Sequence, residues 1–122
     1  MFNVNRVTLL GNATRDPETR TSKSGRRLTV IGLATVRNWR DEAGTRHCEP
    51  DFHRLVCFGK LAEFTADQVK KGTPLYVEGR LHTGQWESGN GEARTSTEII
   101  VDRLVLLSHR PTGAGQTAES GE

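Results

Sequence analysis

A single helical segment interrupts a chain whose other patterned stretches are all strand-like, and this order limits the fold more than any other feature. Residues 60–72 carry Leu61, Phe64 and Val69 at an approximately helical spacing, and Gly72 supplies a stop. Alternating or β-branched stretches lie on both sides of it, at residues 6–12, 27–39, 51–60, 74–86 and 95–107. The sequence therefore predicts the order β, β, β, α, β, β.

Five long strands with one helix between the third and fourth predict an all-β fold, a five-stranded barrel of the oligonucleotide/oligosaccharide-binding (OB) type. The pattern by itself also fits an SH3-like barrel or a small sandwich. Alternation predicts that Ile99, Val101 and Val105 face the same way. In the stretch 27–39, Gly32 and Ala34 leave room for a flat group to approach the backbone.

The composition changes at the end of the chain. Residues 1–108 form one predicted domain, whereas residues 109–122 contain no aromatic residue and no aliphatic residue larger than alanine. Such a segment cannot bury enough apolar surface to fold, so we expect 109–122 to be disordered. No run of about 18 apolar residues occurs, which excludes a transmembrane helix and argues against a membrane partner.

The stretch "DFHRLVCFGK" at 51–60 places an arginine between two phenylalanines. In a strand, Phe52, Arg54 and Phe58 point to one side, while Leu55 and Cys57 point to the other. The two rings could be buried in a core, but the arginine could not, because burying an unpaired charge costs several kcal/mol. The pattern favours a surface that stacks on a ligand, although a core face that includes the two rings remains the alternative.

Trp39 and Trp86 are both predicted to be exposed, because polar residues and turns surround them in "RNWRD" and "TGQWESGNG". Exposed rings beside cations suit a single nucleic-acid strand, since every base can stack on a ring and every phosphate can meet an arginine. The alternative is that the two tryptophans are lone surface rings or lids over the barrel ends. Net charge is only +2 overall, and +3 over residues 1–108 (16 basic, 13 acidic), which permits a polyanionic partner without requiring one.

Catalysis is not expected. The chain has no glycine-rich phosphate loop and no nucleophile motif, so the sequence predicts neither an enzyme nor a cofactor. His47, Cys48, His53 and Cys57 do not have the spacing of a zinc site, so no metal is predicted. Two cysteines without a C-x-x-C pair suit a reduced cytosolic protein.

Several motifs in order make the chain similar to a known family. They are "NRVTLLGN" with "RDPETR", "LATVRNWRD", "FHRLVCFGKLAEF", "KKGTPLYVEGRL" and "TSTEIIVDRL", and together they cover about residues 4–107. The chain resembles the bacterial single-stranded DNA-binding proteins. The resemblance implies an OB-fold homotetramer in the bacterial cytosol, associated with the nucleoid. It also implies sequence-independent binding and protection of single-stranded DNA in replication, recombination and repair.

The resemblance also implies roles for particular residues. The base-stacking positions of the family fall on Trp39, Phe52, Phe58 and Trp86. Its phosphate-binding positions fall on Arg6, Arg54, Lys60, Lys71 and Arg94. His53 and Tyr76 match positions near subunit contacts, so we expect them at the oligomer interface. Phe52 stands where the family often has tryptophan, and "HTGQW" lacks the basic residues that some members carry there.

The chain ends in "GQTAESGE", without the acidic, hydrophobic-tipped motif through which many family members recruit enzymes. We therefore expect DNA coating without recruitment of enzymes by the tail. Two other functions stay open from the residues alone. One is a protein-interaction barrel whose contact with nucleic acid is secondary. The other is a barrel that prefers RNA, because stacking and phosphate pairing do not report on the sugar.

Overall fold

The computed structural model describes residues 1–87, 89, 91–107 and 116–119. Within these residues the chain forms seven strands and one helix, in agreement with the predicted all-β class. In chain order the elements are β1 (Val7–Ala13), β2 (Glu18–Thr21), β3 (Arg27–Arg40), β4 (Arg46–Phe58), α1 (Gly59–Gln68), β5 (Pro74–Glu87), β6 (Ala93–Leu106) and β7 (Gln116–Glu119).

Five of the strands close into a barrel. They are hydrogen-bonded in the order β1-β5-β6-β4-β3, and a further pairing of β1 with β3 closes the ring. That closing pairing joins Asn12 to Ala34 and Ala13 to Leu33, and β4 meets β6 in a short parallel pairing. The helix α1 lies between β4 and β5, the third and fourth strands of the barrel, so the predicted OB-fold architecture is confirmed.

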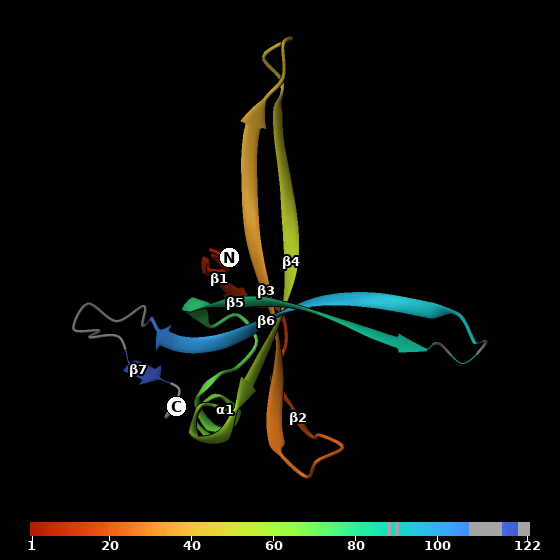
Figure 1. Cartoon of the computed structure of the whole chain (residues 1–122). Coiled ribbons are helices and arrows are strands. Elements are labelled where there is room, and N and C mark those ends of the chain that lie inside the picture. Colours follow the sequence, from red (N-terminus) through yellow and green to blue (C-terminus); the bar gives the residue numbers. More distant parts are fainter. Residues whose placement is uncertain (88, 90, 108–115, 120–122) are drawn as a thin grey trace.

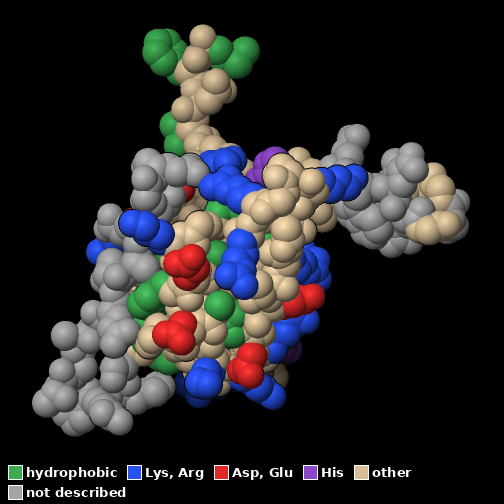
Figure 2. All heavy atoms as spheres, turned by 90° about the horizontal axis from the view of Figure 1, so that it is seen from below, with side chains coloured by type: hydrophobic (Ala, Val, Ile, Leu, Met, Phe, Trp, Pro, Cys, Tyr) green, Lys and Arg blue, Asp and Glu red, His purple; other side chains and the backbone are tan. Residues whose placement is uncertain are grey.

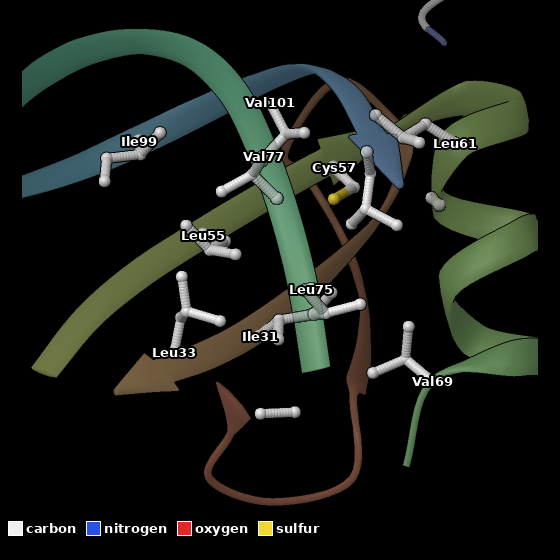
Figure 3. Packing of buried hydrophobic residues seen from close by; sticks show 13 residues of the cluster. Ile31, Leu33, Leu55, Cys57, Leu61, Val69, Leu75, Val77, Ile99 and Val101 are labelled. Atoms are coloured by element: carbon white, nitrogen blue, oxygen red, sulfur yellow. The ribbon is translucent and has the colours of Figure 1, made fainter. Parts of the chain in front are cut away.

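The barrel interior is filled by aliphatic side chains from β3, β4, β5 and β6 together with those of α1. Figure 3 shows them pointing toward one another across the barrel. The fully buried members include Ile31, Leu33, Leu55, Cys57, Leu61, Leu75, Val77 and Leu104. Because α1 contributes Leu61 and Ala62 to the same cluster, the helix is part of the core rather than an appendage.

The helix is shorter than predicted. It ends at Gln68, where the Val69 backbone N–H still bonds to the Thr65 carbonyl while Val69 itself becomes extended. The Val69 side chain is 2% exposed and joins the core cluster, which requires the chain to leave the helix there. Gly72 therefore lies in the turn before β5 and is not the helix stop.

Two strands were not predicted. All four residues of β2 are exposed, so this strand carries no apolar alternation and is held by main-chain pairing with β3. The strand β7 lies inside the segment 109–122, where the sequence predicts disorder, and it pairs with β6 from Arg103↔Glu119 to Leu106↔Gln116. Main-chain pairing does not need apolar side chains, which explains a strand here. The rest of 109–122 lies outside the described residues.

A register shift between Glu78 and Gly79 changes which β6 side chains face the core. Asp102 is the extra residue on β6, since Val101 pairs with Gly79 and the next pair begins at Glu78. Beyond it Leu104 is fully buried, whereas Val105, predicted to face the same way as Val101, is only half-buried.

Two long hairpins extend beyond the barrel in different directions (Figure 1). The β3–β4 ladder continues to Arg40↔Arg46, so most of the loop expected at residues 40–51 is strand and the turn occupies residues 41–45. The β5–β6 ladder continues to Glu87↔Ala93. Among the described residues, the single helix is too short and too polar to cross a bilayer.

Candidate nucleic-acid interface

The strand β4 separates its rings from the core as its alternation indicated. Leu55 and Cys57 are fully buried inside the barrel, while Phe52 is 71% exposed on the opposite face. Arg54 shares that outer face and is also exposed. Val56 lies between Arg54 and Phe58 and is 4% exposed, so the outer face is open at Phe52 and Arg54 and becomes covered farther along.

Phe58 is half-buried and already has a cation over its ring. The guanidinium carbon of Arg26 lies 4.3 Å from the centroid of the Phe58 ring. This cation–π contact is attractive because the negative face of the ring meets the positive guanidinium. A base that stacks on Phe58 must therefore share the ring with Arg26 or displace it.

Arg54 is held by an acid on the neighbouring strand. Its Nε donates a hydrogen bond to Oε2 of Glu98 at 3.3 Å, and the two side chains are 41% and 23% exposed. Ion pairs at this level of exposure contribute only about 0.2–1 kcal/mol. The pair therefore orients Arg54 without preventing it from moving to another anion.

A hollow of about 360 Å³ lies beside Phe52 on this outer face. Its lining comes from β3, β4 and the segment that follows β1, namely Thr14, Arg15, Ile31, Gly32, Phe52, His53 and Arg54. An exposed ring and two arginines thus border one depression. Ring, cation and space for a planar group are the components that an unpaired nucleotide requires.

Trp39 lies near the tip of the β3–β4 hairpin, where its ring already has two neighbours. The His47 ring stacks on it with centroids 5.1 Å apart and an interplanar angle of 19°. The guanidinium carbon of Arg37 lies 4.5 Å from the Trp39 ring centroid. Trp39 is consequently only 36% exposed, and a base must compete with these neighbours for its faces.

Asp41 fixes the position of His47. Its Oδ2 is 2.8 Å from Nε2 of His47, and its Oδ1 accepts backbone N–H bonds from Ala43 and Thr45 in the hairpin turn. The hydrogen bond with His47, followed by the one with the Thr45 backbone, lowers the pKa of the Asp41 carboxyl. Asp41 is therefore an anchored carboxylate that orients the imidazole beneath Trp39.

The register places Trp39 and Phe52 on opposite faces of the hairpin. Successive residue pairs along the β3–β4 ladder point to opposite faces of the sheet. The pair Trp39↔His47 points to the same face as Leu33↔His53, whereas the pair Ala34↔Phe52 points to the other face. The predicted stacking residues therefore do not form one flat platform. A strand of nucleic acid that meets both rings has to pass around the edge of the hairpin.

Trp86 and Arg94 are directly opposite each other in the β5–β6 ladder. Their side chains lie outside the described part of the structure. Their backbone register places them together near the end of the second hairpin, away from the β3–β4 hairpin (Figure 1).

The remaining predicted cations are dispersed. Arg6 forms a loose pair with Asp102, with 3.8 Å between Nη1 and Oδ2. Lys60 is exposed in the first turn of α1, and Lys71 is exposed after the helix, with its backbone N–H bonded to Asp16. On the face seen in Figure 2, Lys and Arg side chains are spread among acidic ones rather than gathered in one patch.

Comparison with known proteins agrees with this geometry. Residues 4–107 match the single-strand binding protein family. The chain belongs to the single-strand binding protein family. A solved structure described as "Plasmodium falciparum SSB complex with ssDNA" superposes with a TM-score of 0.79 at 28% sequence identity, covering 88% of this chain and 98% of that chain.

The two residues that the single-strand binding family resemblance assigns to subunit contacts lie on β4 and β5, two strands that are not paired with each other. His53 is half-buried at the rim of the hollow, and its Nε2 is 2.9 Å from Oγ1 of Thr35. Tyr76 lies on β5, where its hydroxyl donates to Oε2 of Glu78 at 2.8 Å. That hydrogen bond is the main reason why the pKa of Tyr76 is raised.

Sequence reasoning did not identify Arg15, Arg26 or His47 as parts of the interface. Arg15 lies in a stretch with no strand or helix pattern, and its place in the hollow results from tertiary packing. Arg26 reaches Phe58 through β3–β4 pairing, which local patterns do not specify. His47 had a detectable signal, because a hairpin that pairs residue 40 with 46 also pairs 39 with 47.

Among the described residues, no three His, Cys, Asp or Glu side chains gather as a metal site requires. Cys48 is exposed on β4, while Cys57 is buried. Burial raises the pKa of the Cys57 thiol to about 12, despite hydrogen bonds with Thr29 and Thr65 that act the other way. Cys57 is therefore a neutral core side chain.

Proposed function

We propose that this protein binds and protects single-stranded DNA without regard to base sequence, as a non-catalytic coat in replication, recombination and repair. One observation carries the proposal: Phe52, 71% exposed, borders a hollow together with Arg15 and Arg54 on the outer face of the β3–β4 hairpin. Membership of the single-strand binding protein family and similarity to a structure described as a complex with ssDNA support it.

The mechanism combines two sequence-independent contacts. A base of any identity stacks on an exposed ring such as Phe52, which contributes about 1–3 kcal/mol per base. Arginines neutralise the neighbouring phosphates and release counterions, so that affinity falls as salt rises. Neither contact reads the base edges, and duplex DNA offers its bases only in a closed stack.

The test is a titration of intrinsic tryptophan fluorescence with oligomers of dT, of mixed sequence, of matched duplex and of matched RNA. We expect strong quenching by both single-stranded DNAs with similar affinity, and little by the duplex. Protection of the same oligomers from a single-strand nuclease should follow the same order. Equal affinity for duplex and single strand, or no protection, would refute the proposal. A clear preference for RNA would show that the protein is an RNA-binding barrel instead.

We further propose that the protein assembles as a homotetramer. Leu10 on β1 is 60% exposed and is the register partner of Tyr76 on β5, which in turn pairs with Val105 on β6. These three side chains lie on the outside of the barrel, where a small domain gains by covering apolar surface. Sedimentation should give a tetramer, and Leu10→Asp should give smaller species, whereas Leu81→Asp on the exposed β5–β6 hairpin should not. A monomeric unsubstituted protein would exclude this assembly.

A further inference from the structure

We infer that Arg15 is a second phosphate-binding residue, which together with Arg54 holds one phosphate of the nucleotide whose base stacks on Phe52. The three side chains line the same hollow of about 360 Å³. This inference rests on the proposed function and assigns a phosphate subsite within the proposed interface.

Arg15 belongs to no strand, but hydrogen bonds hold the residue before it and the residue after it. The Thr14 N–H donates to the Gly32 carbonyl at 2.9 Å, and Oδ1 of Asp16 accepts the Lys71 N–H at 2.8 Å. Thr14 packs so closely over Gly32 that a Cβ there would overlap the Thr14 hydroxyl. The space predicted above Gly32 for a ligand is therefore filled by Thr14, which fixes the backbone that precedes Arg15.

Arg15 is also free to accept a ligand. Among the described residues, no hydrogen bond or ion pair engages its side chain. A hydrogen bond with Arg20 lowers the pKa of the Glu18 carboxyl most, and the charges of Arg15 and Arg54 lower it further. Both guanidinium groups thus act on the same carboxylate, so both lie within electrostatic reach of one anion.

Without a bound phosphate, the Arg54 guanidinium is paired with the Glu98 carboxylate. The pair at 3.3 Å is half-exposed at Arg54 and weakly stabilising, so a phosphate that also contacts Arg15 can replace it. Glu98 is then an intramolecular competitor of DNA. Its removal should strengthen binding, and the gain should depend on Arg54.

The first experiment compares Arg15→Gln with Lys23→Gln, an equal change of charge at the exposed turn between β2 and β3. Affinity for a short dT oligomer is measured from about 50 to 300 mM salt with the full chain. One phosphate contact on a single strand contributes about 0.7 to the salt slope. Arg15→Gln should therefore lose about 0.7 in slope, and bind about 8-fold more weakly at about 50 mM but only about 3-fold at about 200 mM.

The second experiment is a double-mutant cycle of Glu98→Gln and Arg54→Gln, with Glu63→Gln on the exposed face of α1 as the charge-matched control. Glu98→Gln should tighten binding about two- to fivefold, and this gain should vanish when Arg54 is also replaced. Thermal unfolding of each variant should be unchanged within a few degrees, since these side chains are exposed or half-exposed.

The outcomes separate the subsite from the proposed function. Binding of dT by the unsubstituted protein, with Arg15→Gln indistinguishable from Lys23→Gln, would overturn the assignment of Arg15 and leave the function intact. An equal gain for Glu98→Gln with and without Arg54 would overturn the competition. Failure of the unsubstituted protein to bind dT would remove the proposed function itself.

Discussion

Truncation of Phe52 to alanine should weaken DNA binding without weakening the fold. Phe52 is 71% exposed, so its removal leaves no cavity, and the free energy of unfolding should change by less than about 0.5 kcal/mol. A lost base stack costs about 1–3 kcal/mol, which is a loss of about 5- to 150-fold in affinity per stacked base. The salt slope should not change, because the ring contacts no phosphate.

The assay is tryptophan quenching by a dT oligomer short enough to occupy one protomer, at several salt concentrations, with denaturant unfolding of the same samples. Leu81→Ala is the matched control, since Leu81 is an apolar side chain, 46% exposed, outside the proposed interface. It should alter neither affinity nor stability. A Phe52→Ala protein that binds like the unsubstituted one would refute stacking at Phe52, and a large loss of stability would show that Phe52 supports the core instead.

Four other predictions have defined outcomes. Arg54→Ala should reduce the salt slope for a dT oligomer by about 0.7, and an unchanged slope would remove Arg54 from the phosphate path. Gly79→Ala should lower the denaturant midpoint by the equivalent of at least about 1–3 kcal/mol, because a Cβ there would overlap the Ile100 carbonyl; unchanged stability would contradict that packing. Cys48 should react readily with a thiol reagent while Cys57 stays protected until unfolding, and rapid labelling of both would contradict the buried position of Cys57. Because the pKa of Cys57 is raised from 9.0 to about 12 in the fold, its contribution to stability should be complete below about pH 9 and decline as pH rises toward 12, as measured by unfolding at a series of pH values.

The barrel could be predicted from the sequence because its strands bury one face. On β5, Leu75 and Val77 are buried and alternate with the half-buried Tyr76 and Glu78, so period and face are both visible. The short polar β2 has no such signal, because only its main chain is paired. The position of the extra residue Asp102 could not be predicted from the sequence either, because a register shift depends on how two strands pair.

The candidate interface was predictable only where one strand carries it. Phe52 and Arg54 are two residues apart on β4, so alternation placed them together. Arg15 enters their hollow from a segment about 40 positions earlier in the chain, through its neighbours' contacts with Gly32 and Lys71. Trp39 was expected to be open, but the continuation of the hairpin to Arg40↔Arg46 brings His47 beneath it.

The barrel is joined at two places by very short pairings. The parallel contact of β4 with β6 covers only Leu55↔Ile99 and Val56↔Ile100, and the contact of β1 with β3 covers two pairs as well. Arg54 and Glu98 come immediately before the first of these pairings, one on each strand. An anion that draws Arg54 away from Glu98 thus removes a side-chain contact beside one of the two shortest pairings of the barrel. Binding of an anion by Arg54 should therefore loosen this junction by no more than the roughly 0.2–1 kcal/mol that the exposed pair contributes.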